Sequence, residues 1–290
     1  MVAFFNNLFD ILFYKQNKEG INMKKFSIII PAYNCGKYIS DCLESIKNQT
    51  FTDYEMIIVN DNSTDTTGIK IARFIEQNPN IDVSVIYNKT NMGPGVARNL
   101  GLKKASGEFI LFADGDDYYC DKQAFEHFNS KINSNTDILI FGCKIVYLGN
   151  NDKKVLPTTN IIPKEKDSNP KDELAPFKPL KTVWQICCRR DFLLQNDIFF
   201  QEDIKTFEDV IFRQQAVAMS KNIRTTNKIA YTWNRRITGA SSLTMNKNNT
   251  FFGELRKLVK ATRRIGELAR QYDFSPETEK KAVERVPDEE

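Results

Sequence analysis

The chain has 290 residues, of which 41% are hydrophobic and 27% charged, and it carries a formal net charge of +4. This composition is typical of a soluble globular protein with a substantial core, and the modest charge does not favour a nucleic-acid partner. The single histidine, His127, excludes histidine-rich zinc sites and leaves acid–base chemistry mainly to carboxylates. Six cysteines without C-x-x-C spacing, and no recognisable signal peptide, predict a reduced cytoplasmic setting.

The first 22 residues form a segment of their own. No stretch of the chain reaches the ~18 to 20 apolar residues that span a bilayer. Apolar residues at helical spacing nevertheless mark this segment, namely Phe4, Phe5, Leu8, Phe9 and Leu12. We interpret residues 1–22 as an amphipathic extension that lies on an anionic membrane surface, on a partner, or on the protein's own core.

From residue 26 the pattern alternates between strands and helices. Apolar runs predict strands at 26–30, 55–59, 81–87, 109–113 and 137–141, and Pro31 is expected to end the first of them. Segments between these strands have helical spacing, as in 39–46 and 94–105. The alternation predicts an α/β fold with a mainly parallel, doubly wound sheet flanked by helices.

Beyond residue 141 the rhythm changes. Residues 149–180 are rich in Asn, Lys, Asp and Pro, which indicates a loop or lid-like excursion. Helices near 190–195 and from 207 onwards and a strand at 229–233 follow, and then a basic helix at 251–270 that suits either anionic lipid or solvent. We expect one domain over 23–240, with halves at 23–120 and 121–240, and a C-terminal helical tail over 241–290.

The junction after residue 113 is the most informative segment. The apolar run 109–113 leads directly into Asp114, Gly115, Asp116 and Asp117. Ligands of open α/β sheets bind beyond the carboxyl ends of the strands, and carboxylates are preferred ligands of Mg²⁺ and Mn²⁺. The pattern therefore indicates a metal site, with a solvated acidic turn as the alternative.

Other loops are expected at the same edge of the sheet. The first strand delivers Pro31, Tyr33 and Asn34, the second delivers Asp61, and Arg98 lies in the helix before the fourth strand. A cation beside an acidic metal site suits a diphosphate, because the cation and the metal share its negative charge.

Five ordered motifs closely resemble those of the family 2 glycosyltransferases, which have the GT-A fold. The motifs are IPAYN at 30–34, VNDNSTD at 59–65, NMGPGVARNLG at 91–101, GEFILFADGDD at 107–117 and FEDVIF at 207–212. The resemblance covers about residues 24–235. It departs from the family at Asn60, where the family often carries an aspartate.

The resemblance implies a nucleotide-sugar site and a metal ligand. The binding residues would be Pro31, Tyr33, Asn34, Asp61, Arg98, Asp114 and Gly115. Tyr33 and Asp61 would contact the base, Arg98 would lie near the base and diphosphate, and Asp114 would face the ribose. Asp116 would ligate the Mn²⁺ or Mg²⁺ that bridges the two phosphates.

The resemblance also implies a catalytic base. Asp209, supported by Glu208, would deprotonate the acceptor hydroxyl, whose oxygen displaces the diphosphate directly and so inverts the anomeric centre. Acidic residues at a helix start are the alternative explanation for this pair. Trp184 and Asp117 are candidate acceptor residues, although a tryptophan is more often part of the core.

The function predicted from these motifs is metal-dependent, inverting transfer of a single sugar. The donor would be a nucleotide sugar, with a UDP-sugar favoured. The acceptor would be a glycan or lipid-linked saccharide in capsule, O-antigen or lipooligosaccharide synthesis. We expect the protein to lie in the cytoplasm, and a peripheral position on the inner face of the cytoplasmic membrane is a further option. An inactive nucleotide-sugar-binding module and an Asp-x-Asp phosphotransfer enzyme remain as alternatives.

Overall fold

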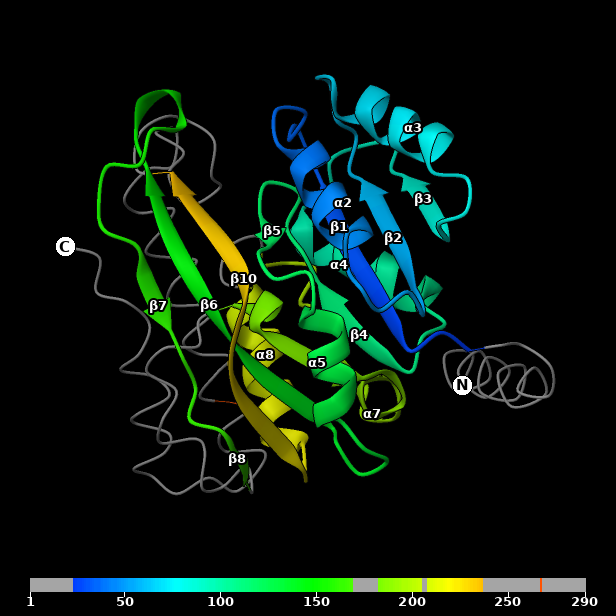
Figure 1. Cartoon of the computed structure of the whole chain (residues 1–290). Coiled ribbons are helices and arrows are strands. Elements are labelled where there is room, and N and C mark those ends of the chain that lie inside the picture. The colour runs from blue at the N-terminus through cyan, green and yellow to red at the C-terminus, as the bar shows by residue number, and fades with distance from the viewer. Residues whose placement is uncertain (1–22, 169–181, 205–207, 237–266, 268–290) are drawn as a thin grey trace, which may run out of the picture.

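The computed structural model describes residues 23–168, 182–204, 208–236 and 267 (Figure 1). The predicted amphipathic extension at 1–22 and the predicted tail at 241–290, apart from residue 267, lie outside these described residues. Within the part of the chain that is described, no helix is both long enough and apolar enough to cross a membrane.

The first half of the chain builds a parallel sheet. Its strands are β1 (Phe26–Ala32), β2 (Tyr54–Asn60), β3 (Val83–Tyr87) and β4 (Phe109–Phe112), in the spatial order β3-β2-β1-β4. Their connections are α2 (Ile39–Lys47), α3 (Thr67–Gln77) and α4 (Pro94–Lys104). β2 and β4 are buried throughout because helices cover both faces, which explains their uninterrupted apolar runs.

The second half extends this sheet with strands of both directions. It contains β5 (Tyr118–Tyr119), α5 (Ala124–Lys131), β6 (Ile138–Leu148), β9 (Ile186–Arg189), α7 (Arg190–Gln195), α8 (Glu208–Met219) and β10 (Ile223–Arg236). β9 lies antiparallel between β4 and β6, whereas β10 runs parallel to β6. The α/β prediction is confirmed, but the parallel order applies to β1–β4 and to the β6–β10 pair, so the sheet as a whole is mixed.

Two local predictions were wrong. Pro31 does not end the first strand, because β1 pairs with β4 only as far as Ile29 and the missing N–H of Pro31 costs no ladder bond on that side. The predicted loop at 149–180 is described as far as residue 168, and this part is not irregular throughout. It forms a 3₁₀ turn η1 (Asn150–Asp152) and the strands β7 (Thr159–Ile161) and β8 (Lys166–Ser168), which pair with β6 and β10.

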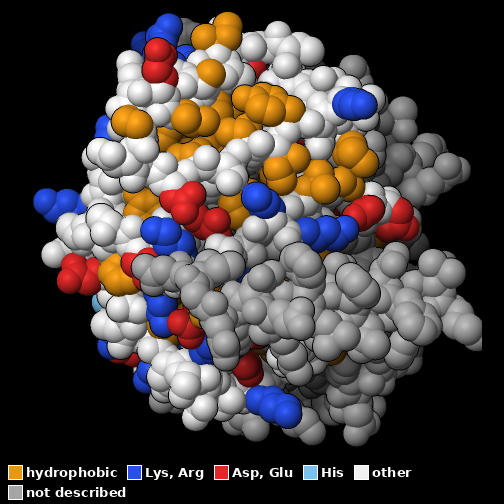
Figure 2. All heavy atoms as spheres, turned by 90° about the vertical axis from the view of Figure 1, so that its right-hand side faces the viewer, with side chains coloured by type: hydrophobic (Ala, Val, Ile, Leu, Met, Phe, Trp, Pro, Cys, Tyr) orange, Lys and Arg blue, Asp and Glu red, His pale blue; other side chains and the backbone are white. Residues whose placement is uncertain are grey.

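Two hydrophobic clusters hold the three layers together. Residues of α2, α3 and α5 pack on one face of the sheet, and residues of α4, α7 and α8 pack on the other. Neighbouring residues of β1 divide between these faces, since Ile28 and Ile30 belong to the first cluster and Ile29 to the second. β3 is the edge strand at one end of the sheet. The face of the molecule that carries β3 and α3 exposes hydrophobic side chains (Figure 2), and Ile69 of α3 and Tyr87 of β3 are exposed.

Candidate active site

The carboxylates after β4 differ in exposure. The side chains of Asp114 and Asp116 are 30% and 34% exposed, whereas Asp117 is buried. All three leave the carboxyl end of β4, where the sequence predicted them. The turn therefore presents two accessible carboxylates and turns the third into the protein.

Asp117 connects the turn to β10. Its Oδ1 accepts a hydrogen bond from the Asn234 backbone N–H at 2.8 Å, and its Oδ2 accepts one from the Tyr231 hydroxyl at 3.3 Å. The same hydroxyl accepts a bond from the backbone N–H of Asp114 at 2.9 Å. Burial, together with the charges of Asp116 and Asp114, raises the pKa of Asp117. The predicted acceptor role does not fit this residue, because its oxygens already hold β10 against the turn.

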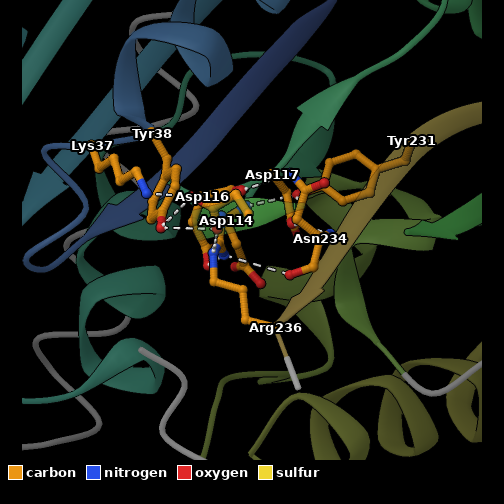
Figure 3. Close-up of polar contacts among 9 residues, drawn as sticks. Lys37, Tyr38, Asp114, Asp116, Asp117, Tyr231, Asn234 and Arg236 are labelled. Atoms are coloured by element: carbon orange, nitrogen blue, oxygen red, sulfur yellow. Dashed lines mark hydrogen bonds and ion pairs between the residues drawn. The ribbon is translucent and has the colours of Figure 1, made fainter. Parts of the chain in front are cut away.

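Asp116 has a cationic partner that the sequence did not reveal. Nη1 of Arg236, the last residue of β10, donates to Asp116 Oδ2 at 2.7 Å (Figure 3). The guanidinium lies 3.7 Å from the centroid of the Tyr38 ring, and its Nε donates to Asp152 at 3.2 Å. Asp152 also pairs with Lys37. Burial and the neighbouring charge of Asp114 raise the pKa of Asp116 to about 6, and Arg236 acts in the opposite direction.

The donor atoms of this turn fit a divalent metal only with help from a ligand. Among the described residues there is no group of three or more His, Cys, Asp or Glu side chains that could hold a metal ion. Mg²⁺ is commonly held by one or two carboxylates with substrate phosphates completing its shell. Asp116 and Asp114 provide such a pair, and the ion pair with Arg236 shows that Asp116 is placed to face positive charge.

Arg98 connects the Asp114 turn to the start of α8. Its Nη2 donates to Asp114 Oδ1 at 2.7 Å and its Nη1 donates to Glu208 Oε1 at 2.9 Å. The Arg98 side chain is 5% exposed, so both ion pairs are shielded from water. Arg98, which was predicted to lie on the donor side, thus also contacts Glu208, the residue predicted to support the catalytic base.

The two acidic residues at the start of α8 have raised pKa values. Burial and the charge of Asp209 raise the pKa of Glu208 to about 7, against the opposing effect of Arg98. Burial also raises the pKa of Asp209, and Arg98 and Arg213 oppose the shift. Asp209 is half-buried, and its side chain accepts a bond from the Val210 N–H at 2.9 Å. Glu208 and Asp209 thus lie at a helix start and also have raised pKa values, so the structure is compatible with both the helix-start and the catalytic-base explanation.

The predicted nucleotide end lies at the carboxyl ends of β1 and β2. Tyr33 is 48% exposed, and Asn34 has a left-handed φ of 48° and accepts the Thr64 N–H through its side chain at 2.9 Å. Asp61 is buried, and its carboxylate accepts the backbone N–H groups of Met92 and Gly93.

These hydrogen bonds give Asp61 a structural role in shaping the loop before α4. Its contact with a base, like that of Tyr33, stays a prediction. Pro31 is half-buried within β1. A Cβ at Gly115 would lie 2.7 Å from Cys35 Sγ, so a larger residue there requires a neighbour to move.

Trp184 is part of the core. It is 3% exposed, and its ring stacks on Tyr231 with a centroid distance of 4.7 Å and an interplanar angle of 16°. The predicted acceptor role does not fit a ring that is covered in this way. The core interpretation, which the sequence favoured for tryptophans in general, describes it better.

The sequence matches characterised glycosyltransferases. The model of Glycosyl transferase family 2 matches residues 27–193. The poly(ribitol-phosphate) beta-N-acetylglucosaminyltransferase TarS of Staphylococcus aureus (strain Mu50 / ATCC 700699) is 34% identical over 213 residues, which are 72% of this chain and 35% of that protein. The poly(ribitol-phosphate) beta-glucosyltransferase of Bacillus spizizenii (strain ATCC 23059 / NRRL B-14472 / W23) is 32% identical over 270 residues, which are 87% of this chain and 40% of that protein.

Solved structures agree with these relatives. The crystal structure of S. aureus TarS 1-349 in complex with UDP-GlcNAc has a TM-score of 0.67 and 28% identity, over 89% of this chain and 70% of that one. The UDP complex of the same protein has a TM-score of 0.66. The chain spans well under half the length of the two curated relatives. The family match over more than half of the chain, the five motifs and the shared architecture lead to one conclusion: the chain belongs to glycosyl transferase family 2 and has the GT-A fold.

Proposed function

We propose that this enzyme transfers one sugar from a UDP-sugar to a hydroxyl of a bacterial surface polymer, with inversion. The observation that carries this proposal is the double ion pair of Arg98, which joins Asp114 on the donor side to Glu208 beside the base. Direct displacement needs a leaving group and a base at opposite ends of one site. Because Arg98 contacts both Asp114 and Glu208, it holds the donor-side carboxylate close to the residue beside the base.

The relatives narrow the substrates to be tested. TarS is named for N-acetylglucosamine transfer and the Bacillus enzyme for glucose transfer, both to poly(ribitol phosphate). UDP-GlcNAc and UDP-glucose are therefore our proposed donors, and a poly(ribitol phosphate) chain is the first acceptor to test. Capsule, O-antigen and lipooligosaccharide precursors, which the sequence favoured, are the next acceptors.

The chemistry of the chain's own residues is acid–base chemistry. Asp209 takes the proton of the attacking hydroxyl, and Glu208 and Arg98 hold its helix and charge environment in place. Asp116 and Asp114 would hold Mn²⁺ or Mg²⁺, which supplies positive charge to the departing diphosphate when it is bound. Arg236 adds positive charge beside Asp116.

An inactive binding module is the competing function. A module of that kind would bind a nucleotide sugar without needing a base, whereas this chain retains the carboxylate of Asp209 at the start of α8. Thermal-shift measurements with UDP-GlcNAc and UDP-glucose, with and without Mn²⁺, test donor binding, because a ligand of the folded state raises its stability. UDP release with poly(ribitol phosphate) present then tests turnover. Donor-dependent stabilisation without any UDP release from any acceptor would support the module instead.

We also propose peripheral binding to anionic membranes through the two terminal segments. Their sequences suit such binding, since one is amphipathic and the other basic. Removal of residues 1–22, or neutralisation of Arg263 and Arg264, should reduce sedimentation with phosphatidylglycerol vesicles, and added salt should mimic the loss. A full chain that never sediments with such vesicles at low salt would exclude the idea.

A further inference from the structure

Asn99, one residue after Arg98, is bonded to the segment that precedes α8. Its side-chain Nδ2 donates to the Phe200 carbonyl at 2.9 Å, and its Oδ1 accepts the Phe200 N–H at 2.9 Å. A third bond runs from Nδ2 to Glu202 Oε1 at 3.2 Å. Asn99 is 3% exposed, so water has little access to this contact. The side-chain amide therefore satisfies the backbone N–H and carbonyl of Phe200 in place of another backbone segment.

Phe200 transmits this contact to α8 through an aromatic stack. Its ring lies parallel to the ring of Phe212, with centroids 4.0 Å apart and an interplanar angle of 7°. Both rings meet Phe112 of β4 edge-on, at 5.4 Å and 5.6 Å. Phe212 lies about one turn after Asp209 on α8, so its position sets the rotation and height of the helix that carries the base.

The same face of α4 touches α8 directly. Gly95, Arg98 and Asn99 are spaced i, i+3, i+4 and therefore share one side of the helix. A Cβ on Gly95 would lie 3.3 Å from Glu208 Cγ and 3.4 Å from Phe200 Cβ. Arg98 pairs with Glu208 and lies over the Phe200 ring at 5.4 Å. Helix α4 thus supports the start of α8 by close approach, by an ion pair and by the bonds of Asn99.

We infer that Asn99 is a positioning residue for the catalytic base, acting through Phe200 and Phe212 on α8. This inference rests on the proposed role of Asp209. Among the described residues, the side-chain hydrogen bonds of Asn99 are with Phe200 and Glu202 rather than with Asp114, Asp116 or Asp209, so its loss should leave donor binding intact. A base displaced by about 1 Å can lower the rate by a factor on the order of 10².

The test compares Asn99→Ala with a variant of another buried polar residue, near the amino end of β1. Ser27→Ala is the matched control, because Ser27 is buried in β1 and bonds Glu55 at 2.6 Å and the Gly107 N–H at 2.8 Å. For each protein, kcat and KM for UDP-GlcNAc, UDP affinity by calorimetry, and the melting temperature are measured. Asn99→Ala should lower kcat about 10- to 100-fold with unchanged UDP affinity, and Ser27→Ala should lower the melting temperature without a comparable loss of kcat.

Phe200→Leu supplies a second route to the same conclusion. If Asn99 acts through Phe200, the kcat losses of Asn99→Ala and Phe200→Leu should not add in the double variant, whereas those of Asn99→Ala and Ser27→Ala should. Wild-type kcat in folded Asn99→Ala, or additive losses with Phe200→Leu, would overturn the inference.

Hydrogen exchange separates this inference from the proposed function, because it needs no substrate. Amides at the start of α8 should exchange faster in Asn99→Ala than in the wild type, with β1 unchanged, even if no acceptor is turned over. Unchanged exchange at the start of α8 would refute the positioning role. Absent turnover of the wild type with every donor and acceptor, together with altered exchange, would count against the proposed function alone.

Discussion

Arg236 Nη1 lies 2.7 Å from Asp116 Oδ2, and the guanidinium is held there by the Tyr38 ring and the Asp152 carboxylate. The last residue of β10 thus places a fixed positive charge on the carboxylate that the sequence assigns to a metal. A divalent cation that binds Asp116 must compete with this ion pair, and that competition can be measured without any substrate.

Arg236→Gln should therefore bind free Mn²⁺ more tightly than the wild type. Loss of a partly exposed ion pair is worth about 1 kcal/mol at most, which corresponds to about a fivefold lower Kd. Titration of the electron paramagnetic resonance signal of free Mn²⁺ measures it. Arg235→Gln is the matched control, since the exposed Arg235 lies over Trp233 instead. Equal affinities in all three proteins would show that the Arg236 pair does not compete with metal at Asp116.

Gly115→Ala should lower the free energy of unfolding by about 1 to 3 kcal/mol, because its Cβ would overlap Cys35 Sγ and lie 3.2 Å from Ile39 Cδ1. Urea denaturation measures the loss. Cys35→Ala removes the overlapping sulfur, so the double variant should be more stable than the sum of the single effects predicts. If Gly115 serves ligand approach instead, Gly115→Ala will weaken UDP binding at unchanged stability.

Glu208→Gln should change how stability depends on pH. The folded-state pKa of Glu208 is raised from 4.5 to about 7, so the folded protein holds this proton more tightly than the unfolded chain. The group therefore stabilises the protein below about pH 4.5 and loses that contribution as the pH rises towards 7. The melting temperature of Glu208→Gln minus that of the wild type should increase from pH 5 to pH 8. A difference that stays constant would contradict the raised pKa.

The first half of the fold was predictable because its signals are local. Apolar runs mark β1 to β4 in the sequence, and apolar residues at helical spacing mark α2 and α4. This alternation of strands and helices was enough to predict the carboxyl edge of the sheet that carries Asp114 and Asp116. α7 and the start of α8 were also placed correctly. Helical signals survive in a single sequence because 3.6-residue spacing does not depend on distant neighbours.

The second half depends on pairings that no local pattern reveals. β7 and β8 are short and polar, and they are strands only because β6 and β10 supply their partners. Arg236 reaches Asp116 because β10 continues past the predicted strand end at residue 233 and pairs with β6 as far as Leu148. In the sequence this residue belongs to a basic pair, Arg235 and Arg236, that follows the predicted strand after Asn234.

The burial of Asp117 escaped prediction for the same reason, and the choice between an acceptor role and a core position for Trp184 could not be made from the sequence. Both residues contact Tyr231 of β10, which lies more than 40 positions away from either in sequence. A carboxylate after a strand and a tryptophan after a polar segment look accessible until that strand is placed. The hydrogen bonds between Asn99 and Phe200 join α4 to the segment before α8. No sequence spacing connects these two residues.

The role of Asp209 is the central claim, and Asp209→Asn tests it most directly. The substitution keeps the shape of the side chain but removes the proton acceptor, and a positioned general base contributes about 10² to 10⁴ in rate. Asp191→Asn, in the first turn of α7, is the matched control for loss of a helix-start charge.

The decisive measurement is kcat for UDP-GlcNAc turnover, with UDP affinity and melting temperature from the same preparation. We expect kcat of Asp209→Asn to fall by about 10² or more, with UDP affinity near that of the wild type and Asp191→Asn fully active. Near-wild-type kcat in well-folded Asp209→Asn, with a lowered melting temperature alone, would contradict the account and leave Asp209 as a helix-start residue.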